Sequence, residues 1–201
     1  GPYVNFYLNP HYLAELVLEK NPSTSLRSAQ GNIMVEFGCP NPLKVFHLGH
    51  LKNLITGESM ARIYENAGYE VIRVNYQGDV GMHVAKALWG VDRLKEEFKK
   101  IKTKFLTEKI IFLGRAYAYG AKAFEENEKA KTEILLYNEK VYEQDKSIQT
   151  TYKITRKWSL NYFALIYKKL DTKYDQMYFE SEVFERGIKL VEEFLKKGIF
   201  V

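Results

Sequence analysis

The hydrophobic pattern of residues 33–76 predicts a strand, a helix and a second strand in that order. The first five residues are apolar apart from Glu36, which is typical of a strand inside a sheet. Apolar residues then recur at helical spacing from 49 to 67, and Gly68 is placed to end this helix. The segment 70–76 is rich in strand formers and predicts the next strand. A unit of this kind implies a parallel sheet with a right-handed crossover.

Helical periodicity dominates the chain after about residue 90. The remaining elements are predicted over these ranges: a strand at 3–8, helices at 11–20, 147–170 and 182–197, a short strand near 177–179, and the start of one more strand at Ile199. The expected fold class is therefore α/β, with a parallel sheet followed by a mostly helical part.

The composition fits a folded domain of 201 residues. Hydrophobic residues make up 46% and charged residues 27%, which excludes a disordered chain, and no apolar run predicts a membrane helix. The single Cys39 allows no internal disulfide, and the first residues lack the features of a signal peptide, so a cytoplasmic location is expected. The net charge of +5 is compatible with a nucleic-acid partner but too small to indicate one.

Residues 47–50, His-Leu-Gly-His, are the sharpest chemical feature of the sequence. They follow a strand and a proline-containing loop and open a helix, whose N-terminal amides attract phosphate. Gly49 has no Cβ, so a ligand can approach the backbone closely. His47 and His50 lie on one face of the first helical turn and can donate hydrogen bonds to phosphate oxygens, and Lys44 adds a mobile cation. Histidines that only cap the helix or fill a core are the alternative interpretation.

Two unusual loops, 38–50 and 75–81, follow the two predicted strands. Both loops are therefore expected at the same end of a parallel sheet, where ligand sites of such sheets lie. The second loop contains Asp79, whose side chain suits an N-cap of the next helix.

The run from Val35 to Asn53 resembles the signature region of class I aminoacyl-tRNA synthetases. It reads VEFGCPNPLKVFHLGHLKN, and its flanks are similar to arginyl-tRNA synthetases. The match continues in order and spacing through further segments, at 57–59, 68–76, 78–81, 119–124, 155–160 and 178–182. The first six residues are similar to the family's junction between an N-terminal tRNA-contacting domain and the catalytic domain.

The resemblance implies the first half of a Rossmann-like nucleotide-binding sheet followed by a helical insertion. On this basis the chain divides into a junction segment at 1–28, the first half of the catalytic fold at 29–90, and a helical connective insertion at 91–201 that returns toward the sheet. The implied activity is that of an arginine–tRNA ligase, which converts L-arginine and ATP to arginyl-adenylate and pyrophosphate and then transfers the arginyl group to tRNA(Arg). The family's second catalytic half and anticodon-binding domain have no counterpart here, so a partial catalytic domain, inactive alone, is expected.

The resemblance also implies roles for single residues. The expected ATP-binding residues are Lys44, His47, Gly49 and His50, of which Lys44, His47 and His50 are also expected to be catalytic. The expected arginine-binding residues are Glu36, Cys39, Pro40, Asn41 and His50. Asp79 is expected to order the neighbouring site loop. ATP is a substrate that carries Mg²⁺ with it, and no intrinsic metal is expected.

Some positions depart from the family pattern. Cys39 stands where many members have serine or alanine, Val80 where they have tryptophan, and Lys52 where arginine is common.

Two other functions stay open: a small nucleotidylyltransferase, which also uses a His-x-Gly-His motif, and a non-catalytic RNA-binding protein derived from a synthetase. The lysine-rich stretch 95–109 is interpreted as a solvated face, with contacts to acceptor-stem phosphates as the second interpretation. His83 is interpreted as an ordinary helix residue.

Overall fold

The computed structural model describes residues 32–200. Its elements, in chain order, are β1 (Asn32–Glu36), α3 (Leu48–Asn66), β2 (Glu70–Gln77), α4 (Met82–Arg93), α5 (Lys95–Ile101), α6 (Leu106–Glu126), α7 (Glu128–Tyr142), α8 (Lys146–Lys169), β3 (Gln176–Phe179) and α9 (Glu180–Lys196). The strand expected at 3–8, the helix expected at 11–20 and the junction segment 1–28 lie outside the described residues, as does Val201.

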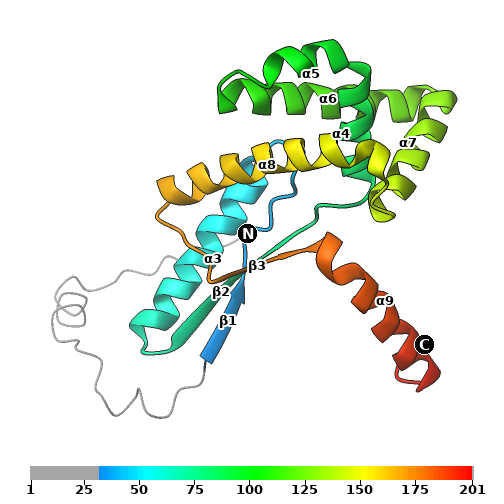
Figure 1. The fold of residues 1–201 in the computed structure, drawn as a ribbon. Coiled ribbons are helices and arrows are strands. Elements are labelled where there is room, and N and C mark those ends of the chain that lie inside the picture. The colour runs from blue at the N-terminus through cyan, green and yellow to red at the C-terminus, as the bar shows by residue number, and fades with distance from the viewer. Residues whose placement is uncertain (1–31, 201) are drawn as a thin grey trace, which may run out of the picture.

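The sheet has three parallel strands in the order β1–β2–β3, and α3 makes the crossover from β1 to β2 (Figure 1). Val74 in the central strand pairs with Glu36 on one side and Gln176 on the other. The predicted strand–helix–strand unit is confirmed, because each observed boundary lies within one residue of the expected one. The short strand expected near 177–179 is also confirmed, as β3.

The helices α4 to α7 form a layer beyond the carboxyl end of the sheet, and α8 leads from this layer back to β3 (Figure 1). Phe98 and Phe112 of this layer pack with Trp158 of α8 in one of its buried clusters, and burial of such side chains stabilises this part of the fold. The helices α4 and α6 cross closely at Gly120, where a Cβ would lie 2.0 Å from the backbone oxygen of Lys86. The long helix expected at 147–170 is confirmed as α8.

Helix α9 begins two residues earlier than expected and has no buried residue. Four of its apolar side chains are exposed: Ile188, Leu190, Val191 and Leu195. In Figure 1 the helix projects away from the sheet, and the ring of Phe184 contacts Tyr142 at a centroid distance of 5.3 Å.

The prediction of a strand that begins at Ile199 is wrong. Gly198 adopts a left-handed conformation with φ of 68°, and the amides of Ile199 and Phe200 turn back to the carbonyl oxygen of Phe194. This is the hydrogen-bond pattern of a helix C-terminal cap. Among the described residues no neighbouring strand is present to pair with these two residues, so their β-forming side chains do not determine the backbone.

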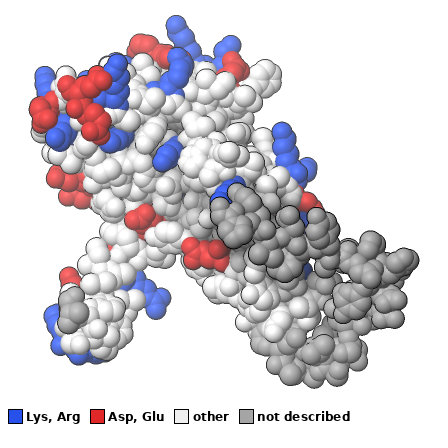
Figure 2. All heavy atoms as spheres, turned by 180° about the vertical axis from the view of Figure 1, so that it is seen from behind, with Lys and Arg blue, Asp and Glu red and all other residues white. Residues whose placement is uncertain are grey.

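Lysine and arginine side chains are interspersed with acidic ones over the helical layer (Figure 2). The predicted solvated face at 95–109 is mostly exposed, and its charges pair locally: Lys99 contacts Glu96 at 2.7 Å, and Arg115 contacts Glu97. None of the helices within 32–200 has a stretch long and apolar enough to cross a membrane.

Candidate active site

The three strands end at one edge of the sheet, and different parts of the candidate site follow them. Glu36 ends β1, Gly78 follows β2 and Glu180 follows β3. Parallel sheets bind ligands outside these carboxyl ends. A groove of about 500 Å³ between β1 and α3 is lined by residues that include Glu36, Gly49 and Lys52. The groove therefore places one residue expected for arginine and one expected for ATP beside the same cavity.

His47 and His50 stack against each other at the start of α3. Their ring centroids are 3.8 Å apart, with 20° between the planes. His47 Nδ1 accepts a hydrogen bond from the amide of Gly49 at 3.1 Å, and the amide of His47 donates to His50 Nδ1 at 3.3 Å. The two histidines therefore do cap the helix, as the alternative interpretation required. Because both Nδ1 atoms accept, each neutral ring carries its proton on Nε2, which can donate to a ligand.

His50 is neutral at physiological pH. Burial lowers the pKa of His50 to about 4, and the positive charges of His47 and Lys44 add to this effect. Burial is also the main cause of the lowered pKa of His83, to which the charge of Lys44 contributes. The charge of Lys44 thus lowers the pKa of both His50 and His83. The Lys44 ammonium group lies 5.9 Å from the ring centroid of Tyr117.

The loop between β1 and α3 has a strained start and is held at both ends. Gly38 and Cys39 both have positive φ, 84° and 45°. A positive φ is uncommon for a residue other than glycine, so the backbone is strained at Cys39. The amide of Gly38 donates to Asn53 Oδ1 at 2.8 Å, and the amide of Leu43 donates to Ser159 Oγ at 2.9 Å. The loop is therefore fixed between α3 and α8, which is the rigidity that a binding loop needs.

Cys39 and Glu36 lie side by side in this loop region, with Cys39 Sγ 3.7 Å from Glu36 Oε1. Burial raises the pKa of the Cys39 thiol, and the charge of Glu36 raises it further. A thiol that stays protonated is a poor nucleophile. Glu36 is exposed, whereas Pro40 is buried.

Asn41 and Glu180 converge above Gly78. A Cβ on Gly78 would lie 3.0 Å from Asn41 Oδ1 and 3.1 Å from Glu180 Oε2. Burial and the negative charge of Asp79 raise the pKa of Glu180. A side chain at Gly78 would therefore crowd both oxygens, so the turn after β2 favours glycine here.

Asp79 is completely buried and connects three segments of the chain. Its Oδ2 accepts hydrogen bonds from Tyr152 at 3.0 Å and from Arg156 Nε at 2.8 Å, both on α8. The hydroxyl and the amide of Ser181 also donate to the Asp79 carboxylate, each at 2.8 Å. The residue that caps α4 is Gly81 and not Asp79, so the simple capping interpretation for the next helix is wrong.

A family model described as tRNA synthetases class I (R), catalytic domain, matches residues 12–201. The chain belongs to the class I arginyl-tRNA synthetases. It is 32% identical over 209 residues to the arginine–tRNA ligase of Borreliella afzelii, covering 98% of this chain and 34% of that protein. It is 30% identical over 217 residues to the cytoplasmic arginine–tRNA ligase of Saccharomyces cerevisiae, covering 99% of this chain and 34% of that protein. The chain thus spans about a third of the length of the curated relatives it matches.

The arginyl-tRNA synthetase of Thermus thermophilus has a similar structure, with a TM-score of 0.65 and 25% sequence identity. The likeness covers 94% of this chain and 31% of that one. It confirms the expected α/β fold with a parallel sheet. The family model also removes the support for a small nucleotidylyltransferase, which was the second interpretation of the His-x-Gly-His motif.

Sequence reasoning missed three residues that lie at the candidate site although they are distant from its motif in the sequence. Arg156, Glu180 and Ser181 lie in two of the segments that carried the family resemblance, yet nothing in those segments indicated a role. His83 is a helix residue as interpreted, but its Nε2 also lies 2.9 Å from the carbonyl oxygen of Gly78. Within residues 32–200, no group of three His, Cys, Asp or Glu side chains could hold a metal ion.

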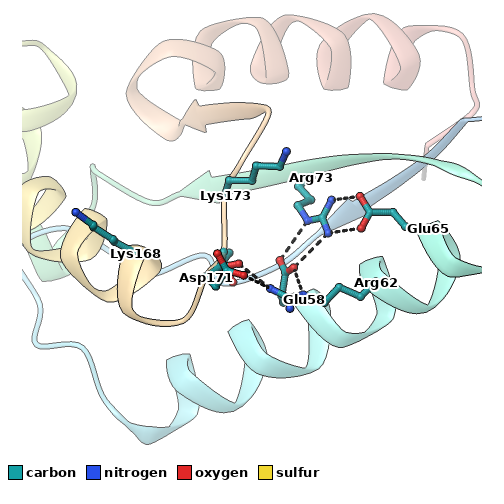
Figure 3. A pocket seen from close by; sticks show the side chains of 8 residues that line it. Glu58, Arg62, Glu65, Arg73, Lys168, Asp171 and Lys173 are labelled. Atoms are coloured by element: carbon teal, nitrogen blue, oxygen red, sulfur yellow. Dashed lines mark hydrogen bonds and ion pairs between the residues drawn. The ribbon is translucent and has the colours of Figure 1, made fainter.

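A second cavity, of about 550 Å³, contains mainly paired charges (Figure 3). Arg73 lies between Glu58 and Glu65, with Nε 3.2 Å from Glu58 and Nη1 2.6 Å from Glu65. Glu58 also accepts from Arg62 at 2.7 Å. Arg73 is on β2 and both carboxylates are on α3, so these pairs hold the crossover helix of the synthetase fold against its sheet.

Proposed function

We propose that this chain forms part of the active site of an arginine–tRNA ligase, which activates L-arginine with ATP and transfers it to tRNA(Arg). The observation that carries the proposal is the stacked His47–His50 pair at the start of α3, beside a groove that Glu36 also lines. Membership of the arginyl-tRNA synthetase family supports the choice of substrates. The chain spans about a third of its relatives' length, so the complete reaction belongs to the proposal as well.

ATP binds at the N-terminus of α3 in this proposal, with its phosphates near His47, Gly49, His50 and Lys44. A carboxylate oxygen of arginine attacks the α-phosphorus, the bond to the pyrophosphate oxygen breaks, and arginyl-adenylate forms. Negative charge grows on the phosphate oxygens during this step. The Nε2–H groups of the two histidines donate to these oxygens, and the Lys44 ammonium offsets their charge. Mg²⁺ enters as the companion of ATP.

Arginine binds along the loop after β1, at Glu36, Cys39, Pro40, Asn41 and His50. The exposed Glu36 carboxylate matches a guanidinium, because such a pair forms two parallel charge-assisted hydrogen bonds. Cys39 and Pro40 shape the loop, and Pro40 is buried, so it contributes through its backbone. This end of the site carries the negative charge of Glu36 and the other end carries the positive charge of Lys44, which orients a substrate that carries a cation at one end and reacts with phosphate at the other.

Asp79 serves the site by fixing the turn after β2 to α8 and α9, without contact to the substrate. The partner tRNA(Arg) accepts the arginyl group in the second step. The cytoplasm is the proposed compartment, in keeping with the name of the yeast relative.

The test is the thermal stability of the chain with ATP and Mg²⁺, and separately with L-arginine, with L-lysine as the control. A ligand at a hundred times its dissociation constant stabilises the folded state by about 2.7 kcal/mol, which raises the unfolding midpoint. We expect a shift with ATP that His47→Ala abolishes, and a shift with arginine but not with lysine. Equal shifts with arginine and lysine would remove the arginine assignment, and no shift with ATP would remove the proposed phosphate site.

A further inference from the structure

The cavity of about 550 Å³ that Figure 3 shows lies away from the histidine pair. Arg62 lines it and lies about 18 Å beyond His50 along the axis of α3. The other walls come from β2, at Arg73, and from the end of α8 and the segment 171–173 that leads to β3. The proposed ligase reaction uses none of these residues.

The carboxylates of Glu58 and Glu65 in this cavity have both of their oxygens occupied. Arg73 donates to Glu58 Oε2 at 3.2 Å and to the two oxygens of Glu65 at 2.6 and 2.9 Å. Glu58 Oε1 accepts from Arg62 Nε at 2.7 Å. The third carboxylate, Asp171, accepts from Arg62 Nη2 at 3.3 Å, and its side chain is 96% exposed. A cationic ligand would therefore find the acceptors inside the cavity already taken.

Hydrogen-bond donors, in contrast, are left over. Thr172 lines the cavity and is only 7% exposed, yet its hydroxyl has no hydrogen-bond partner within residues 32–200. A buried hydroxyl without a partner costs free energy, so native structures rarely leave one in this state. Arg62 donates through Nε and Nη2, which leaves the N–H groups of Nη1 without a partner in the described part of the chain. The cavity therefore suits a ligand that accepts hydrogen bonds.

The charges around the cavity favour an anion. Four basic and three acidic side chains line it, so their net charge is positive. Lys173 extends toward Arg73, whereas Lys168 points away from the ion pairs (Figure 3). Hydrogen bonds from Arg73 lower the pKa of Glu65, and the charges of Lys173 and Arg62 lower it further. Both of these cations thus act on the interior of the cavity.

We propose that Arg62, Thr172 and Lys173 form a binding site for a phosphate group. A phosphate carries negative charge on several acceptor oxygens, which match one hydroxyl, the free guanidinium N–H groups and one ammonium group. Arginine and lysine are the residues that proteins use to bind phosphate. The site does not rest on the proposed function, because it shares no residue with the ATP and arginine positions. Its phosphate comes either from a free phosphorylated molecule or from an RNA backbone.

A cavity that only holds the fold together is the simpler interpretation. The ion pairs of Arg73 connect β2 to α3, and this role accounts for Glu58 and Glu65 as well. It does not account for the buried hydroxyl of Thr172. Thr172→Val separates the two interpretations, because it removes a hydroxyl that stabilises nothing in the unliganded chain but that would donate to a bound phosphate.

The experiment is a titration of the chain with inorganic phosphate, followed by NMR through the amide signals of residues 171–173. These signals locate the site and separate it from the start of α3. Thr172→Val should weaken phosphate binding about tenfold, the size of one hydrogen bond to a charged group. The same variant should leave the urea midpoint unchanged or raise it, because an unpartnered buried hydroxyl is lost.

Lys173→Gln should weaken phosphate binding about two- to fivefold, the usual size of one exposed charge. Lys169→Gln is the matched control and should leave the affinity unchanged. Lys169 is also an exposed lysine, at the end of α8, but it does not line this cavity.

A short single-stranded oligoribonucleotide distinguishes the two sources of phosphate. If an RNA backbone is the source, the oligonucleotide binds more tightly than inorganic phosphate, and Thr172→Val weakens both. If a free phosphorylated molecule is the source, inorganic phosphate shifts the amide signals of 171–173 and the oligonucleotide does not. Either pattern supports a phosphate site in this cavity.

Three results would overturn the inference. Amide signals of 171–173 that do not move even at high millimolar phosphate would show that the cavity binds no phosphate. An unchanged affinity in Thr172→Val, or a loss no larger than that of Lys169→Gln, would show that the hydroxyl does not contact the ligand. A lowered urea midpoint in Thr172→Val would show that this hydroxyl stabilises the fold instead.

Discussion

The carboxylate of Asp79 accepts hydrogen bonds from both the amide and the hydroxyl of Ser181, each at 2.8 Å, across 102 residues of sequence. The amide belongs to the first turn of α9 and has no partner within its own helix. Asp79 therefore caps α9 from the turn after β2. The same carboxylate binds Arg156 of α8, so a single buried group connects the sheet, the helical layer and the helix that follows β3.

Asp79→Asn should destabilise the folded chain by about 3 kcal/mol, because it leaves Arg156 without its counter-charge and weakens the cap on α9. Arg156 is itself partly exposed, which places the loss at the low end of the range for a broken buried pair. Urea unfolding monitored by circular dichroism measures the change. The control is Asp171→Asn, whose side chain is 96% exposed and which should change stability by less than about 0.5 kcal/mol. Similar effects of the two substitutions would contradict the connecting role of Asp79.

The strand–helix–strand unit could be predicted from the sequence because its information is local. Apolar spacing defines β1, α3 and β2, and Gly68 ends the helix with φ of 93°. The position of the His47–Gly49–His50 motif at a helix start followed from the same pattern. The observed partners of Asp79 could not be predicted, because they come from α8 and α9 and no local spacing encodes such pairings.

Glu180 and Ile199 are two further cases in which the local sequence could not predict the structure. Glu180 lies near Asn41 only because three parallel strands end at one edge, which is a property of the assembled sheet. Ile199 has strand-forming chemistry, but a strand also requires a neighbour, and the local cap at Gly198 determines the backbone instead.

The stability of the chain should fall between about pH 7 and about pH 5, in part because of His50. The folded-state pKa of His50 is about 4, below its ordinary value, so in this range the unfolded state binds the proton more readily. The stabilisation that neutral His50 provides is thus complete above its ordinary pKa and is lost as the pH falls toward the folded-state value. We expect the urea midpoint of the unaltered chain to fall more over this range than that of His50→Gln.

His83 also has a lowered pKa, mainly through burial, but it is present in both proteins and its effect cancels. The comparison therefore isolates His50. Parallel midpoints in the two proteins across the range would show that His50 is not held neutral by its surroundings.

Gly120→Ala should destabilise the helical layer by about 1–3 kcal/mol, the usual cost of overpacking. The added Cβ would lie 2.0 Å from the backbone oxygen of Lys86, which cannot rotate away, so α4 and α6 must separate. Urea unfolding again provides the measurement. Gly187→Ala in α9 is the control, since nothing lies within 4 Å of its Cβ, and it should stabilise by up to about 1 kcal/mol. A stabilising effect of both substitutions would show that the two helices do not cross this closely.

Gly78→Ala should weaken arginine binding while leaving the fold and ATP binding intact. Gly78 is not among the residues with positive φ, so its backbone accepts alanine without strain. The new methyl group would lie 3.0 Å from Asn41 Oδ1 and 3.1 Å from Glu180 Oε2, and both side chains can shift by a few tenths of an ångström. The methyl group would nevertheless displace the Asn41 side chain, which the proposed function places at the bound arginine. We expect a loss of about tenfold or more in affinity for L-arginine by calorimetry, the size of one weakened hydrogen bond to a charged group. Equal losses for ATP and arginine would indicate a general disturbance of the sheet edge, and an unchanged arginine affinity would contradict the proposed contact between Asn41 and arginine.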